Sequence, residues 1–264
     1  MKIHWMDRGS PSVDELKILL SKLDEVGYES VLTVYDSVFS DKWMKSAFSL
    51  NLNHKTKYMI ALRPYSISPE LAAMMVEAFN EYAPDRLIFN IVAGDILNHE
   101  TSIDDVVDLD ISTPEKRTEY TGKWLEKFKK IKIMTKIPEM GLAGISDNTL
   151  KNAKKYGDFP IAMLHHYFQY PEKYKDFKRI MVSFAVVIRE TQKEADDFIK
   201  NLPNEWEANW TIWGNKKEVY DKIYELKKMG VTDILISTHP KDDKIDLIHN
   251  FAKIIIDGEK NGSI

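Results

Sequence analysis

The sequence contains no cysteine, and this absence excludes several kinds of chemistry at once. A disulfide framework, a thiol nucleophile, an iron–sulfur cluster and a cysteine-ligated zinc all need residues that are missing. Glycine and proline are scarce, at 11 and 10 of 264 residues, well short of the roughly 25 to 30% typical of low-complexity chains. The 44% of apolar residues therefore predicts a globular protein with a sizeable core.

The chain also lacks an excess of positive charge and a long apolar run. Its 37 lysines and arginines against 41 acidic residues give a net charge of -4, so we expect neither nucleic acid nor an anionic membrane as a partner. No run of 18 apolar residues is present, and residues 1–8 become charged before the apolar region of a signal peptide could develop. We therefore expect a cytoplasmic protein.

Short apolar runs alternate with helical patterns along the whole chain, which favours β-α units and a parallel sheet. The first helix has a capping box at Ser12 and Glu15 and ends at Gly27, and the same signals return between Asn215 and Gly230. Further helix starts are predicted at Ser68, Thr113, Ser146 and Thr191. Eight segments have strand patterns: 2–5, 30–34, 57–62, 86–92, 139–143, 160–164, 180–188 and 233–237.

Eight such units predict the α/β class and a (β/α)₈ TIM barrel, in one domain over residues 1–264. A doubly wound open sheet is the alternative, but no glycine-rich dinucleotide turn follows an early strand. The acidic stretch 96–112 is expected to be a loop inserted on the C-terminal face, and a candidate lid. Within 201–213, three tryptophans at spacings of four and three predict one helix face, seated on the barrel or at a dimer surface, rather than a site wall.

Several familiar kinds of active site are disfavoured. His165 and His166 are adjacent, so on a strand they point to opposite faces and cannot both bind one ion, and we expect no metal site. No second histidine is separated from His4 by a single residue, as barrel metal hydrolases would need on the first strand, and no G-x-S-x-G nucleophile turn occurs. Carboxylate pairs for glycoside hydrolysis could come only from acidic residues that more often cap helices: Asp7, Asp36 and Asp95.

Two segments carry a specific resemblance. Residues 60–73, IALRPYSISPELAA, and residues 85–95, DRLIFNIVAGD, resemble the third and fourth β-α units of the bacterial luciferase-like flavin monooxygenases. The alkanesulfonate monooxygenase branch is the most similar, because an A-L-R-P strand end, a Ser-Pro helix start and an N-x-V-T-G strand end recur there in this order. Weaker similarity at 144–146, 187–195 and 213–237 extends the resemblance over roughly residues 2 to 250.

This resemblance implies a barrel that binds reduced FMN at the C-terminal ends of its strands. Arg63 would be a candidate catalytic residue, and the helix that starts at Ser146 would hold the phosphate, because a helix N-terminus attracts anions. Ser146 could equally be a plain helix cap, and Asn90 a turn residue. The residues expected to bind the cofactor are Leu62, Asn90, Ala93, Gly94, Gly144 and Ser146, with Arg63 beside them.

The chain also departs from that branch. Ala93 replaces a threonine, Thr113 and Pro114 stand about where an Arg-Tyr pair is expected, and the positions of an arginine and a histidine hold Ser183 and Ala185. The long insertion before the last β-α unit, with its mobile lid and arginine, is reduced to about 202–214. Sulfonate specificity is therefore not expected.

His239, at the end of the eighth predicted strand, is the remaining acid-base candidate, with a structural turn histidine as the alternative. Four residues are expected to line an apolar substrate pocket, although each could equally be packing: Trp5, Met6, Tyr35 and Phe39. The resemblance implies a two-component monooxygenase that takes reduced FMN from an NAD(P)H:flavin reductase and oxygenates a small organic molecule through a C4a-(hydro)peroxyflavin. It also implies a homo-oligomer, a dimer or tetramer.

Two alternatives remain at this stage. The chain could be a non-catalytic flavin-binding protein of the luciferase-like group, which the missing lid favours. It could also be an oxidoreductase that uses the deazaflavin F420 on the same barrel, although residues 90–94 are more similar to the FMN-binding branch.

Overall fold

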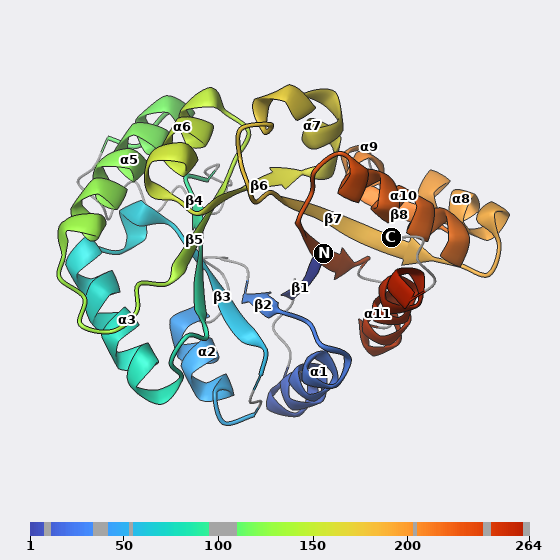
Figure 1. Ribbon diagram of the computed structural model, residues 1–264, viewed down its shortest axis with the longest axis horizontal. Helices are drawn as coiled ribbons and strands as arrows, with labels where there is room; N and C mark the ends of the chain where they lie inside the picture. The colour runs from blue at the N-terminus through green and yellow to red at the C-terminus, as the bar shows by residue number, and fades with distance from the viewer. Residues whose placement is uncertain are drawn as a thin grey trace.

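The computed structural model describes residues 1–7, 12–33, 42–52, 55–94, 110–202, 205–239 and 244–260. Parallel strands form a ring, and helices surround it on the outside (Figure 1). No helix among the described residues is both long and apolar enough to cross a membrane.

The strands are β1 (Lys2–Asp7), β2 (Ser30–Thr33), β3 (Lys57–Leu62), β4 (Leu87–Val92), β5 (Glu139–Ala143), β6 (Phe159–Met163), β7 (Met181–Ile188), β8 (Thr211–Gly214) and β9 (Asp233–Thr238). The helices are α1 (Val13–Val26), α2 (Lys42–Ser49), α3 (Pro69–Tyr82), α5 (Pro114–Lys130), α6 (Asp147–Tyr156), α7 (Leu164–Gln169), α8 (Gln192–Lys200), α9 (Glu205–Asn209), α10 (Lys216–Lys228) and α11 (Lys244–Lys260). Two single turns of 3₁₀ helix, η1 (Pro64–Ser66) and η2 (Pro171–Lys173), follow β3 and α7.

Eight of these strands close a barrel. Each of β1 to β6 pairs in parallel with the next, β6 pairs with β7, β7 with β9, and β9 with β1. The predicted (β/α)₈ barrel is confirmed, and each of the eight predicted strands overlaps one strand of the ring. The open-sheet alternative is therefore wrong.

The remaining strand, β8, lies outside the ring. Only the first part of β7 pairs with β6, and β8 pairs with its later residues Ala185 to Ile188 (Figure 1). The prediction of one helix face across 201–213 is wrong, because α9 ends at Asn209 and Trp213 belongs to β8. A spacing of three and four residues fits a helix, but the last two tryptophans flank and occupy a short strand instead.

The local signals for helix ends are confirmed where they were predicted. Ser12 with Glu15 and Thr191 with Glu194 form capping boxes, and Gly27 ends α1 in the left-handed conformation with φ of 84°. The predicted insertion after the fourth strand lies outside the described residues except for 110–112. The chain leaves the described part after Gly94 and returns just before α5, so both flanks of that insertion lie at the C-terminal ends of the strands.

The middle of the barrel is filled by apolar side chains that form a cluster separate from the outer core. Gly141 makes this packing possible, because a Cβ atom there would lie 2.5 Å from the ring of Phe159. The cluster is formed by Leu32, Met59, Ala61, Ile88, Phe159, Ile161, Met181 and Leu235. It separates the two ends of the barrel from each other.

The N-terminal end of the barrel is closed by a network of charged and polar side chains. The Arg179 guanidinium donates to Asp233 at 2.7 and 3.1 Å and also to Glu139. His4 is fully buried, with its Nε2 2.9 Å from Asp233 Oδ1 and its Nδ1 2.7 Å from the Ser30 hydroxyl. A neutral imidazole protonated on Nε2 would donate to an ionised Asp233 and accept from Ser30, and so would satisfy all three side chains.

The pKa values follow from this arrangement. Burial lowers the pKa of His4 below its ordinary value, against the opposing effect of its hydrogen bond to Asp233. Burial alone would raise the pKa of Asp233, but hydrogen bonds from His4, Arg179 and Thr232 outweigh it and hold that pKa far below the ordinary range. The network therefore stays in one protonation state at neutral pH.

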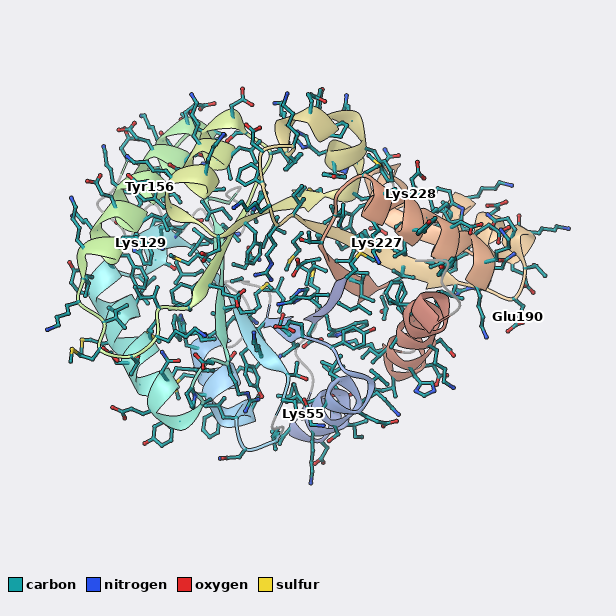
Figure 2. The ribbon with its side chains drawn as sticks, in the orientation of Figure 1. Lys55, Lys129, Tyr156, Glu190, Lys227 and Lys228 are labelled. Carbon is teal, nitrogen blue, oxygen red and sulfur yellow. The ribbon has the colours of Figure 1, made fainter. Side chains whose placement is uncertain are left out.

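The outer layer packs the helices against the outward-facing strand residues. Trp5 lies in this layer, 1% exposed, with its ring edge-on to Tyr28 at 6.3 Å. Side chains fill the inside of the ring, while the labelled Lys55, Lys129 and Glu190 lie on the periphery (Figure 2). The first and last helices, α1 and α11, are neighbours in this layer.

Candidate functional site

A cavity of about 490 Å³ lies at the C-terminal end of the barrel. All eight strands of the ring, or the residues directly after them, contribute to its wall, so it lies on the barrel axis. Small side chains at this level, such as Ala61, Ala143 and Ser183, leave the space that larger residues fill further down. The C-terminal end of a TIM barrel is where its active sites are found, and the volume is that of a small-molecule site.

The wall of the cavity is mainly apolar with a few polar groups. Arg63 is the one charged side chain among the described residues that line it, and no described lining residue is a carboxylate, lysine or histidine. The uncharged polar side chains of the wall are Asn90, Thr118, Ser146, Thr149 and Ser183. Such a wall is mainly apolar and carries positive rather than negative charge, as suits a largely apolar ligand with an anionic group.

Asn90 is placed in the cavity wall by the alternation of β4, whose inward-facing residues are Ile88, Asn90 and Val92. Its side chain is 6% exposed, and its Oδ1 atom is buried without a hydrogen-bond partner among the described residues. A buried acceptor left unsatisfied costs about 1–3 kcal/mol. A buried acceptor in a cavity wall, such as Asn90 Oδ1, is normally satisfied by a donor group of a bound ligand or by an ordered water.

Arg63 and Gly94 meet at the rim of the cavity. Gly94 has a φ of 77°, and a Cβ atom there would lie 3.3 Å from the Arg63 guanidinium and 3.2 Å from the Tyr65 hydroxyl. Glycine is therefore required at this position for two reasons: the left-handed backbone conformation and the close approach of Arg63. Arg63 also donates to the Tyr65 hydroxyl at 3.0 Å. Arg63 is 7% exposed, so the rim holds a buried cation.

The start of α6 opens onto the same cavity. Ser146 caps this helix by accepting from the Thr149 backbone N–H at 3.1 Å, and Gly144, Ser146 and Thr149 all line the cavity. Unpaired N–H groups and the helix dipole make such a terminus favourable for a phosphate. The cap role of Ser146 is therefore observed, and it places the helix where a phosphate could bind.

The structure brings together most of the residues expected at the site. Arg63, Asn90, Ala93, Gly94, Gly144 and Ser146 line the cavity, and so does Met6. Leu62 and Trp5 do not: both belong to the outer core behind the barrel wall. Strand alternation is the reason, because Ala61, Arg63 and Met6 take the inward positions beside them. Tyr35 and Phe39 lie outside the described residues.

His239 directly follows β9, as expected, but it is not among the residues that line the cavity. Its Nε2 lies 3.3 Å from Glu207 Oε2, and its ring packs edge-on against Phe198 with centroids 5.0 Å apart. The expectation that its imidazole faces the cavity is therefore corrected: β9 carries it past the described wall toward α8 and α9.

Arg117 and Thr118 were not expected from the sequence. Arg117, 4% exposed, donates from Nε to the Gly94 carbonyl at 2.8 Å and from Nη1 to that of Ile111 at 3.0 Å, and Thr118 lines the cavity. Arg117 follows the cap residue of α5, Thr113, by one helical turn. Its signal was the run of Arg117, Thr118 and Thr121 on the inner face of α5, all of which are buried.

A metal centre is not supported by the described residues, which contain no group of three or more His, Asp or Glu side chains arranged to hold an ion. His165 and His166 both belong to α7 rather than to a strand. His166 is instead hydrogen-bonded through Nδ1 to the Tyr174 hydroxyl at 2.8 Å.

No family model matches this sequence. Among solved structures, the chain is similar to long-chain alkane monooxygenase (LadA), with a TM-score of 0.76, 9% identity and coverage of 99% of this chain and 91% of that one. It is also similar to riboflavin lyase (RcaE) with modified FMN and riboflavin, with a TM-score of 0.75, 10% identity and coverage of 99% and 92%. An F420-dependent secondary alcohol dehydrogenase matches with a TM-score of 0.72, 13% identity and coverage of 97% and 98%. These likenesses extend over the whole chain and show the fold.

Proposed function

We propose that this protein is a flavin-dependent monooxygenase of the luciferase-like type that binds reduced FMN in the cavity at the C-terminal end of its barrel. The observation that carries the proposal is the coincidence, in one cavity, of the buried unpartnered Oδ1 of Asn90, the cation of Arg63 and the N-terminus of α6. An isoalloxazine needs hydrogen-bonding partners on an apolar wall, and its phosphate needs positive potential. All three features derive from residues that the sequence resemblance had singled out.

The described residues divide the work of binding. Ser146 and the first N–H groups of α6 would hold the phosphate, and Asn90 would accept from an N–H group of the ring system. Arg63 would stabilise negative charge on the reduced cofactor, at a site where its own charge is largely shielded from water. Arg117 would act indirectly. It holds the carbonyl of Gly94 in place, and Gly94 belongs to the rim of the cavity against which Arg63 packs.

When bound, reduced FMN supplies the activation of O₂ that a monooxygenase needs. The chain contributes an enclosing apolar wall, formed in part by Met6, Leu32 and Ile161, that keeps water from the reaction. None of the described lining side chains is an ordinary proton donor or acceptor at neutral pH, so orientation and exclusion of water are their roles. An NAD(P)H:flavin reductase would deliver the reduced flavin, as the resemblance implies.

The test is an anaerobic titration of the protein with FMN in both redox states, followed by fluorescence or calorimetry. Tighter binding of reduced than of oxidised FMN is expected. Equal affinity for the two states would favour a flavin-binding protein without turnover. If FMN does not bind in either state, the proposal is wrong.

F420 is the second candidate, favoured by the likeness of the fold to an F420-dependent secondary alcohol dehydrogenase. The same titration with F420 distinguishes the two cofactors, because both offer a phosphate to α6 but only F420 carries a tail beyond it. Binding of F420 with no binding of FMN would assign the chain to hydride transfer instead of oxygenation.

A further inference from the structure

One layer of inward-facing side chains in the barrel is made of unusually small residues. In the register of the strand pairs, the inward positions advance by two residues at every second strand, which is the stagger of an eight-stranded barrel. Alternate strands therefore contribute to a common layer. The layer of β1, β3, β5 and β7 consists of Met6, Ala61, Ala143 and Ser183, all of which line the cavity. Bulky branched residues usually fill such layers, so the three small side chains leave space within the barrel.

This space is closed from below by larger side chains, and the charge of the cavity lies above it. On the neighbouring strands, the layer pairs with residues that line the cavity one level lower, because the strands tilt: Leu32, Asn90, Ile161 and Leu235. Arg63 is two residues beyond Ala61 and thus one layer nearer to the C-terminal end. The start of α6 likewise follows β5 beyond Ala143. The cavity therefore has a charged upper level and an uncharged chamber below it.

Ser183 is the polar side chain of this chamber layer. The residue is 7% exposed and lines the cavity. Its hydroxyl forms no hydrogen bond with another described residue, yet the oxygen is not sealed from the cavity by neighbouring atoms. The hydroxyl therefore offers its hydrogen bond to whatever occupies the chamber.

The chamber favours an uncharged occupant. Neither the layer of Ser183 nor the level beneath it contains a charged side chain among the described residues. An ion there would lose hydration without a counter-charge beside it, which is strongly unfavourable, and an anion finds Arg63 and the start of α6 at the upper level instead. Met6 adds a flexible thioether that can adapt to the shape of an apolar group.

We propose that the chamber formed by Met6, Ala61, Ala143 and Ser183 is a subsite for a small, uncharged, mainly hydrocarbon molecule with one hydrogen-bond acceptor. Ser183 donates to that acceptor, and the other side chains of the layer contact the hydrocarbon part. The subsite itself rests on the cavity and on Ser183. Its identification as the place of the substrate, below a flavin at the upper level, rests on the proposed monooxygenase function.

The test is a titration of the flavin-free protein with cyclohexanone and with methylenecyclohexane, two uncharged molecules of similar shape of which only the ketone accepts a hydrogen bond. NMR signals of ¹³C-labelled methionine methyl groups report both the position and the affinity of each probe. The signals expected to shift belong to the methionines that line the cavity, Met6 and Met163. The signals expected to stay unchanged belong to methionines exposed on the outside of the barrel: Met44, Met74 and Met134.

Three variants separate the hydroxyl from the space around it. Ser183→Ala should weaken binding of the ketone by roughly 2- to 12-fold, the value of a neutral hydrogen bond, and leave methylenecyclohexane unaffected. Ser146→Ala is the matched control, because Ser146 lines the upper level of the same cavity, and it should change neither affinity. Ala143→Leu fills the chamber and should weaken binding of both probes by at least about tenfold, in a protein whose thermal unfolding shows that it is folded.

The subsite is overturned if neither probe shifts the Met6 signal, or if Ser183→Ala binds the ketone as tightly as the wild type does. An equal loss in Ser146→Ala would also overturn it, because the ketone would then lie at the upper level. These titrations contain no flavin. If FMN binds in neither redox state while the ketone still depends on Ser183, the monooxygenase proposal is wrong and the subsite stands. If FMN binds as expected and the ketone does not depend on Ser183, the subsite alone is wrong.

Discussion

The two ends of the barrel differ in whether their buried polar side chains find hydrogen-bond partners. At the N-terminal end, His4, Ser30, Glu139, Arg179 and Asp233 satisfy one another. At the C-terminal end, Asn90 and Ser183 each keep a polar atom without a partner among the described residues. An apolar cluster separates the two layers. The closed end therefore stabilises the fold, while the open end keeps hydrogen-bonding capacity for a molecule that is not part of the chain.

The largest effect is expected from breaking the closed end. Asp233→Asn removes the charge that pairs with Arg179 and replaces one of the two oxygens that accept its hydrogen bonds with a donor NH₂ group, so the free energy of unfolding should fall by about 3–5 kcal/mol. Chemical denaturation measures this loss. The control is Asp197→Asn, whose exposed ion pair with Lys200 spans 3.8 Å and should contribute within about 0.5 kcal/mol. A loss below about 1 kcal/mol in Asp233→Asn would contradict the role assigned to the network.

A pair of buried asparagines compares the satisfied and unsatisfied states directly. Asn80, 7% exposed, donates to Thr135 Oγ1 at 3.0 Å and to the Lys136 carbonyl at 2.7 Å, whereas Asn90, 6% exposed, leaves Oδ1 unpaired. Asn80→Leu should lower stability by about 1–3 kcal/mol and leave FMN affinity unchanged. Asn90→Leu should preserve stability and weaken FMN binding by a similar amount. Equal destabilisation by both variants would remove the distinction.

Two matched helix caps compare a serine in the cavity with one outside it. Ser146 and Ser68 each accept from a backbone N–H at 3.1 Å, at the starts of α6 and α3, but only Ser146 lines the cavity. Replacing either serine by alanine should cost about 1 kcal/mol of stability. Only Ser146→Ala should also reduce the ratio of the affinity for FMN to the affinity for riboflavin, because the two ligands differ in the phosphate that α6 would hold. A riboflavin affinity equal to that of FMN in the wild-type protein would place the phosphate elsewhere.

The smallest effect concerns pH. The pKa of His4 is lower in the folded than in the unfolded chain because of burial, so the unfolded chain binds protons first as pH falls through about 6.5. Stability is therefore full above this pH and falls below it, by at most about 0.8 kcal/mol between pH 7.5 and 6 from this residue. His4→Gln should reduce that slope in denaturation curves recorded across this range. A slope identical to that of the wild type would mean that His4 does not titrate differently on folding.

The fold followed closely from the sequence because its signals are local. Capping serines and threonines, Gly27 after α1 and the eight apolar runs each depend on a few adjacent residues. β8 was missed because its four residues are too short to show a period, and because the tryptophans before and within it are spaced as on a helix. Strand pairing to β7, a tertiary contact, determines its conformation.

The site was predicted in part. The resemblance located Arg63, Asn90, Gly94 and Ser146, all of which line one cavity. Leu62 was misplaced although strand alternation could have shown that Arg63 and its immediate neighbour face opposite sides, and Trp5 beside Met6 is the same case. The unused hydroxyl of Ser183 had no sequence signal, since whether a buried hydroxyl finds a partner depends on side chains from distant strands.

The pairing of His4 with Asp233 joins residues 229 positions apart, and this distance determines when the barrel can close during synthesis. At roughly 5–20 residues per second, β1 waits roughly 10 to 50 s after its own translation before β9 exists to pair with it. Until then the edges of β1 and β7 remain open, and Arg179 lacks its main acceptor. The last strand thus completes both the hydrogen bonding of the ring and the charge balance of its closed end. A nascent chain that stalls before residue 233 presents two unpaired edges and an arginine, Arg179, whose only carboxylate partner in this network is the partly exposed Glu139. Unpaired strand edges are features that chaperones and proteases meet in unfinished proteins.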